Sequence, residues 1–308
     1  MLKLYDDTYI SQLADAIRDK NRLETLYKLE DMPGAVNALT VYSDLLTILG
    51  SDTTFNLKDG DFITDAVKIP AYCFYNCANI REVELEGITE IGAYAFAGSG
   101  ITKAIFPNCV SVGDFAFYQR NDLKNGSINL DNCESFGVSA FEGCAIGDPA
   151  PSHKITFEKT KSIGNKAFYE SGKVFEQGAS TELTMPLCES IGASAFANYY
   201  QQIGFNLLTL DLPKIKTIGD YAFRWDFITN LKLGADCTSI GTGIFYNSSC
   251  TNLYCYATTP PTLAGTFIGW AGDYSAVTNI YVPAESVDAY KAANIWSGYA
   301  SKIQAMPS

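Results

Sequence analysis

The residues best suited to chemistry in this sequence are nine cysteines and one histidine, His153. A Cys/His nucleophile pair or a zinc site would need them at ligand or hydrogen-bond spacing. There is no CxxC pair, and His153, in a predicted loop between Pro151 and Lys154, has no cysteine at ligand spacing. The phosphate-binding patterns GxGxxG and GxxxxGK(S/T) do not occur. We therefore expect a non-enzymatic protein with no catalytic residues, no metal and no cofactor.

Aromatic side chains could instead recognise a ligand by contact. Tyrosine follows a recurring phenylalanine at four positions, Tyr75, Tyr118, Tyr169 and Tyr246. Its flat ring costs little side-chain entropy to hold in place, and its hydroxyl adapts to many partners. The candidate ligand-binding residues are Tyr118, Tyr169, Tyr199, Tyr200, Trp225 and Tyr246. The alternative is that these rings only pack over an edge of the fold and support neighbouring loops.

The elements that position these rings belong to an internal repeat. Eight copies of a block such as "IGAYAF" or "IGNKAF" end at phenylalanines spaced 21 to 28 residues apart: Phe74, Phe96, Phe117, Phe141, Phe168, Phe196, Phe223 and Phe245. A period of this length, with apolar residues at fixed offsets, is typical of a solenoid in which each turn contributes one short strand. The glycine of the block is expected where the chain turns tightly or approaches its neighbour.

The strands are predicted about eleven residues before each phenylalanine, in runs with alternating apolar residues such as "REVEL" and "ELTM". Between strand and phenylalanine, one slot holds Cys109, Cys133, Cys188 or Cys237 in some copies and isoleucine in others. A thiol that exchanges with isoleucine is a small buried hydrophobe. The predicted fold is a right-handed leucine-rich-repeat-like solenoid with one parallel β-sheet.

These blocks resemble the BspA-type leucine-rich repeats of bacterial surface and phage-associated proteins. The resemblance covers about residues 69 to 257 and departs from the pattern at Pro70 and Ile244. It implies a solenoid and a binding role, but no particular ligand, because solenoids host many unlike partners.

The ends of the chain differ from the repeats. Residues 1–40 form a predicted helical module for docking or capping, with Ile10, Leu13, Ala14 and Ile17 on one helix face. This segment resembles the opening of tail-associated proteins of phages and prophages. Residues 41–68 are an atypical first turn, residues 69–258 hold about eight repeats, and residues 259–308 form a C-terminal cap that buries Trp296.

The repeats differ in length along one arc only, after each phenylalanine. The longer arcs, near residues 118–127, 142–154, 169–180 and 197–206, come from four consecutive coils. Length variation confined to one face usually marks a binding face.

The sequence favours a phage or prophage virion protein that binds a host-surface protein or glycan and attaches to other tail proteins through its N-terminal helices. The alternative is a bacterial cell-surface adhesin whose export signal is absent from this sequence. A net charge of -12 disfavours nucleic acid, and no apolar run is long enough to insert into a membrane. Self-association into a homo-oligomer is compatible with either hypothesis.

Overall fold

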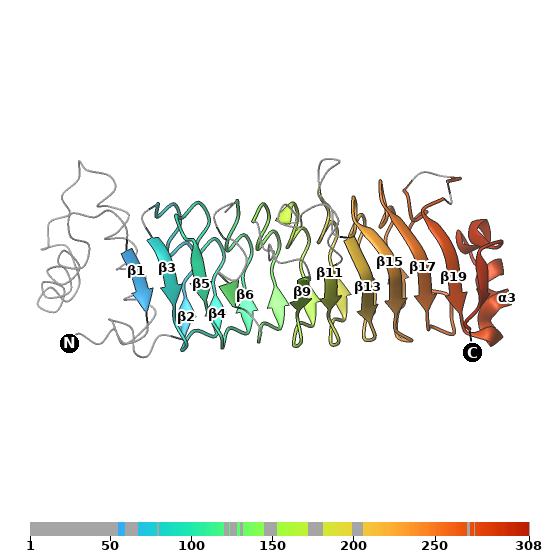
Figure 1. Cartoon of the computed structure of the whole chain (residues 1–308), viewed down its shortest axis with the longest axis horizontal. Coiled ribbons are helices and arrows are strands. Elements are labelled where there is room, and N and C mark those ends of the chain that lie inside the picture. The colour runs from blue at the N-terminus through green and yellow to red at the C-terminus, as the bar shows by residue number, and fades with distance from the viewer. Residues whose placement is uncertain are drawn as a thin grey trace, which may run out of the picture.

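The chain is a solenoid whose coils stack along one long axis, with the C-terminal elements at one end (Figure 1). The computed structural model describes residues 55–58, 67–78, 80–119, 123, 128–129, 132–144, 153–171, 181–198, 206–269, 272–273 and 275–307. The predicted N-terminal module, most of the long arcs, and Tyr199 and Tyr200 lie outside these residues.

One face of each coil is a broad strand, because alternating apolar residues let the strand bury one side and expose the other. Within the described residues these strands form two parallel sheets, ordered β1-β3-β5-β7 and β20-β19-β17-β15-β13-β11-β9. Their bounds are β1 Phe55–Lys58, β3 Ile80–Glu84, β5 Lys103–Ile105, β7 Ile128–Asn129, β9 His153–Thr156, β11 Thr181–Thr184, β13 Asn206–Leu212, β15 Phe227–Leu233, β17 Ser249–Cys255, β19 Val277–Val282 and β20 Ile303–Ala305.

A second face carries a two-residue strand from each coil. These strands form one parallel sheet with the order β18-β16-β14-β12-β10-β8-β6-β4-β2 across the described coils. Their bounds are β2 Lys68–Ile69, β4 Glu90–Ile91, β6 Ser111–Val112, β8 Ser135–Phe136, β10 Ser162–Ile163, β12 Ser190–Ile191, β14 Thr217–Ile218, β16 Ser239–Ile240 and β18 Thr262–Leu263. In each, the second residue is buried and the first is at least partly exposed.

The C-terminal elements close the end of the stack. After β19 come the 3-10 turn η3 (Ala284–Ser286), the helix α3 (Val287–Ala292) and the 3-10 turn η4 (Trp296–Tyr299). Three large rings from this segment are buried and hydrogen-bonded to the last coil. The Tyr290 hydroxyl donates to Ala257 O, Trp296 Nε1 donates to Pro261 O, and the Tyr299 hydroxyl accepts from Phe267 N.

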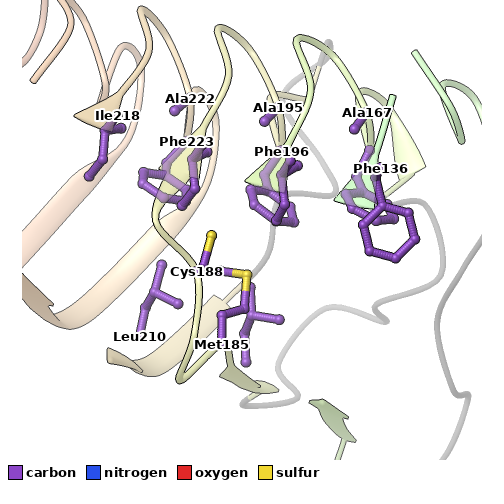
Figure 2. Close-up of a cluster of buried hydrophobic side chains, with 14 of the residues drawn as sticks. Phe136, Ala167, Met185, Cys188, Ala195, Phe196, Leu210, Ile218, Ala222 and Phe223 are labelled. Carbon is purple, nitrogen blue, oxygen red and sulfur yellow. The ribbon is translucent and has the colours of Figure 1, made fainter. Parts of the chain in front are cut away.

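The core is a ladder of phenyl rings, one from each copy of the block. From Phe74 to Phe223, each ring stacks on the ring of the next coil, with centroids 4.8 to 5.9 Å apart and planes within 12° of parallel. Figure 2 shows Phe196 and Phe223 in one row, with Ala195 and Ala222 in a second row beside them. We call this row the phenyl ladder, and its burial confirms the predicted solenoid core.

The block glycine serves the close approach of one coil to the next. A Cβ added to Gly164 would lie 2.6 Å from the carbonyl carbon and oxygen of Gly137. Since real Cβ atoms are not found so near to a backbone atom, only glycine lets these backbones meet at this distance. The sequence allowed two roles for this glycine, a tight turn or a close approach between coils. The structure shows the close approach.

Three details differ from the sequence-based expectation. One sheet was expected, but the short strands pair into a sheet of their own because their backbones also meet at every coil, and the broad strands divide between β7 and β9. Residues 257–265, rich in threonine and proline and expected to form the exit loop from the solenoid, continue the coil instead: they contain β18 and are followed by the buried Phe267. His153, expected in a loop, begins β9, since its backbone pairs with Thr181.

Candidate binding surface

The third edge of each coil is a pair of tight turns around the ladder phenylalanine. We call it the double-turn edge, from three residues before the phenylalanine to two after it. Its backbone N–H groups donate to the next coil at alternate residues, as in Phe96 N to Ala116 O at 2.7 Å and Phe117 N to Ala140 O at 2.8 Å. This edge therefore has its own hydrogen-bond ladder, although its residues are not strands.

The residue two before the ladder phenylalanine has a left-handed backbone, with φ between 52° and 63° in all eight copies. In the first three coils this residue is aromatic. Tyr94 is stacked between Tyr72 (centroids 4.9 Å apart, 5° between planes) and Phe115 (4.7 Å, 11°). We call these three rings the outer ladder, because they run parallel to the phenyl ladder on the solvent side.

Two further tyrosines lean edge-on against the outer ladder. Tyr75 meets Tyr72 at 5.8 Å and 72°, and Tyr118 meets Phe115 at 5.5 Å and 76°. Tyr72 and Tyr75 expose 53% and 38% of their surface, although both are large aromatic residues. Together these five rings form what we call the aromatic patch, built on the first three copies of the block, in which Tyr94, Phe115 and Tyr118 are half-buried.

The structure separates the predicted site residues rather than gathering them. Tyr118, Tyr169, Trp225 and Tyr246 all lie half-buried on the double-turn edge. Tyr118 and Tyr169 are two coils apart, with Glu142 in the same position between them. Tyr118 and Tyr246 are five coils apart, about 24 Å at the usual spacing of stacked strands. They cannot all contact one small ligand.

A second aromatic group surrounds Tyr246 and is packed more tightly. Tyr221 meets Tyr246 edge-on at 5.8 Å, and the Arg224 guanidinium lies 4.9 Å from the centre of the Tyr246 ring. The Tyr221 ring lies against Gly243, because a Cβ added to Gly243 would lie 2.5 Å from Tyr221 Cε1. Through these contacts the rings hold one coil against the next. They agree with the alternative that the tyrosines only pack over an edge of the fold and support neighbouring loops.

The outer ladder was not predicted from the sequence. All the candidate rings come after the phenylalanine, whereas Tyr72, Tyr94 and Phe115 precede it by two residues. The signal was present in "AYCF", "AYAF" and "DFAF". Periodicity alone cannot show that a residue inside the block points outward, because that depends on the left-handed turn.

Carboxylates flank the aromatic patch on the side of the later coils. Glu142 directly follows Tyr118 along the edge, and Glu170 lies one coil further. Partial burial, and then the negative charges of Glu142 and Glu170, raise the pKa of Tyr118 above its usual value. This end of the patch therefore has two negatively charged side chains that act on Tyr118.

The broad face of the last coils offers a different surface, made of side-chain amides. Asn252 Nδ2 donates to Asn230 Oδ1 at 2.9 Å, and Asn279 Nδ2 donates to Asn252 Oδ1 at 3.0 Å. Beside them, Tyr254 and Tyr281 stack at 4.8 Å. Each amide here already bonds to its neighbour, so a ligand would have to compete with the chain's own contacts.

The cysteines are buried, as predicted for Cys109, Cys133, Cys188 and Cys237. Burial raises the pKa of Cys188, Cys237 and Cys250 to about 12, so these thiols stay protonated at neutral pH. A protonated thiol is a weak nucleophile and a weak metal ligand. Within the described ranges, no three His, Cys, Asp or Glu side chains are grouped as a metal site.

Within the described part of the chain, none of the helices has both the length and the apolar character that crossing a membrane requires.

Comparison with known proteins agrees with this architecture. Residues 52–174 and 171–263 match the family model described as "BspA type Leucine rich repeat region", with six copies. A leucine-rich repeat protein from Bacteroides ovatus ATCC 8483, solved by crystallography, aligns with a TM-score of 0.50 and 22% identity. The alignment covers 75% of this chain and 58% of that one, and at this identity it shows the fold alone. No curated protein matches the sequence.

Proposed function

Because this chain belongs to the BspA-type leucine-rich repeat family, we propose that it is a non-catalytic bacterial surface protein that binds another protein, and that the aromatic patch is its contact surface. The observation that carries the proposal is the stacked outer ladder, in which Tyr72 is exposed and Tyr94 and Phe115 are half-buried. A repeat fold needs its inner ring in every coil, but only four of the eight copies carry an aromatic residue at the outer position, and the stacked rings come from the first three copies. The outer rings therefore serve something other than the repeat itself.

The backbone supports the same inference. Tyr72, Tyr94 and Phe115 have φ of 60°, 57° and 55°. A left-handed backbone costs a residue with a Cβ roughly 1–2 kcal/mol, and the cost is absent for glycine. The eighth copy has Gly243 at this position, so the fold accepts the relaxed residue. A bulky ring at a strained exposed site is expected where the ring makes a useful contact.

The stacking also favours a protein over a glycan. Both faces of Tyr94 are covered, by Tyr72 and by Phe115. Sugars pack their C–H groups on the open, electron-rich face of an aromatic ring. What the middle of the ladder presents is ring edges and hydroxyl groups, which suit the mixed apolar and hydrogen-bonding surface of a protein.

The virion hypothesis has less support. It depends on the resemblance of residues 1–40, which lie outside both the described residues and the matched family region. The alternative from the sequence, a surface adhesin, agrees better with the family and with the exposed patch.

The test is a binding screen of the full chain against an array of purified surface proteins and, in parallel, a glycan array. We expect protein ligands, and we expect the variant Tyr72→Ser/Tyr75→Ser/Tyr94→Ser to lose them. The matched control is Tyr254→Ser/Tyr281→Ser, which removes stacked tyrosines from the broad face. Thermal unfolding of both variants shows whether the fold is kept.

Two results would contradict the proposal. One is binding to glycans only. The other is protein binding that the broad-face variant loses and the patch variant keeps.

A further inference from the structure

We propose that the carboxylate end of the aromatic patch, formed by Tyr118, Glu142 and Glu170, receives an arginine or lysine side chain of the protein partner. This inference rests on the proposed function and adds the chemistry of the partner, a basic segment. A cation lying against a tyrosine ring and between carboxylates gains from the ring quadrupole and from the charges together.

Three consecutive coils place these groups side by side. Gln119 N donates to Glu142 O at 2.8 Å, and Gly143 N donates to Tyr169 O at 2.8 Å. The residues that directly follow the ladder phenylalanine are therefore neighbours in the order Tyr118, Glu142, Tyr169. Gly143 adds no side chain beside Glu142, and Glu170 occupies the equivalent position in the next coil.

Two of the four tyrosines at this repeat position have a cation of the chain against their rings. Lys166 Nζ lies 5.2 Å from the centre of the Tyr169 ring, and the Arg224 guanidinium lies 4.9 Å from that of Tyr246. Lys166 comes from the position two before the phenylalanine of the same coil, and Arg224 from the preceding coil.

Near Tyr118, the two repeat positions that supply these cations hold apolar residues. Phe115 is at the repeat position of Lys166, and Ala97 is at the repeat position of Arg224. Tyr118 thus has the position that binds a cation elsewhere, but the chain supplies no cation from either place.

Among the residues that the structure describes, the carboxylates beside Tyr118 also have no ion-pair partner, since neither Glu142 nor Glu170 forms a salt bridge. Elsewhere on the surface, equivalent positions of adjacent coils do pair opposite charges, as in Lys161 with Glu134 at 2.7 Å and Lys216 with Glu189 at 2.7 Å. The two glutamates at Tyr118 therefore differ from these pairs, in which a charge on one coil is balanced by the opposite charge on the next coil.

The test uses two short glycine–serine peptides that differ only in charge. One carries paired arginines, and the other carries citrulline, which keeps the shape of arginine and removes its charge. Binding to the full chain is followed by fluorescence anisotropy at roughly 0.15 M ionic strength, where distant charges are screened. We expect the arginine peptide to bind about tenfold more tightly than the citrulline peptide.

Two double variants decide where the preference comes from. Glu142→Gln/Glu170→Gln should reduce the arginine preference to less than about twofold. The matched control, Glu158→Gln/Glu285→Gln, removes the same charge from two exposed glutamates elsewhere and should keep the preference. Tyr118→Leu should also reduce it, because leucine has no ring face for the cation.

The inference is overturned if the two peptides bind equally, or if the control variant loses the preference as fully as the site variant. Its failure differs from failure of the proposed function. If the patch variant loses the partner found in the screen while Glu142→Gln/Glu170→Gln keeps it, the patch is the binding surface and the basic segment is wrong. If no array protein binds, the proposed function itself fails.

Discussion

Two ladders of aromatic rings run along the same edge of this solenoid, one inside and one outside, and their extents differ. The inner rings stack without interruption from Phe74 to Phe223. The outer rings stack across Tyr72, Tyr94 and Phe115 at nearly the same spacing, and the next coil has Ser139 in their place. A buried phenylalanine is present in all eight copies, including Phe245 beyond the stacked rings, because every coil needs its core filled. The outer ladder is restricted to a few coils, as expected for a feature kept for a local purpose.

The largest expected effect is on the inner ladder. Phe117→Ala should lower the free energy of unfolding by about 3–5 kcal/mol, because it removes a fully buried ring and leaves a cavity between two stacked neighbours. Denaturant unfolding of the full chain measures this change. Phe115→Ala, two residues away on the outside, should cost less than about 1.5 kcal/mol, the value of a stacked pair. Equal losses would mean that the two ladders do not differ in role.

A smaller loss of stability is expected where two coils of the phenyl ladder approach each other through their glycines. In Gly164→Ala the new methyl group would meet the backbone of Gly137, so the two coils would have to move apart. Overpacking of this kind costs about 1–3 kcal/mol. Denaturant unfolding is again the measurement, and a crystal structure of the variant would show whether the coils separate. An unchanged stability would show that the close approach is not required.

The free energy of unfolding should also decrease at alkaline pH, because of a buried thiol on the inner side of the coils. Burial raises the pKa of Cys188 to about 12, from an ordinary thiol value of 9.0. Between these values the unfolded chain has lost a proton that the folded chain keeps. Stability is therefore complete below about pH 9 and falls as the pH rises toward 12.

This alkaline loss can be separated from other titrations with Cys188→Ala. The variant should be less stable than wild type at neutral pH, because a buried thiol is removed. From about pH 8 to about pH 10 it should lose roughly 1 kcal/mol less stability than wild type does. Thermal or denaturant unfolding under reducing conditions at both values measures this difference. Parallel curves for the two proteins would show that this thiol does not contribute.

The smallest expected effect on stability is at the end of the outer ladder. Tyr72→Asn removes one stacking contact, but asparagine tolerates the left-handed backbone better than tyrosine does. These two effects oppose each other, so the free energy of unfolding should change by less than about 1 kcal/mol. Binding to the partner from the protein array should nevertheless weaken. A large loss of stability with unchanged binding would make the outer ladder structural.

Much of the fold could be predicted from the sequence because the same core residues recur in eight copies of the repeat. The phenylalanine, the alanine before it and the isoleucine at the start of the block recur at fixed offsets, and each is buried in the structure, as in Phe196, Ala195 and Ile191. The broad strands end within one residue of the predicted positions, for example at Ile105 and Leu212. Burial of apolar residues at constant spacing is a local property, so it can be recognised in one dimension.

The candidate surface could be predicted from the sequence only in part, for a physical reason. The sequence by itself determined that the chain winds into coils, that its cysteines occupy apolar slots, and that tyrosines gather near the ladder phenylalanine. Only the tertiary structure decided that Tyr72, Tyr94 and Phe115 point outward and stack, and that Glu142 and Glu170 stand beside Tyr118 without an ion-pair partner among the described residues. Which side of a turn a residue faces depends on its backbone angles, and which residues become neighbours depends on the register between coils. Neither quantity is encoded in the spacing of one repeat.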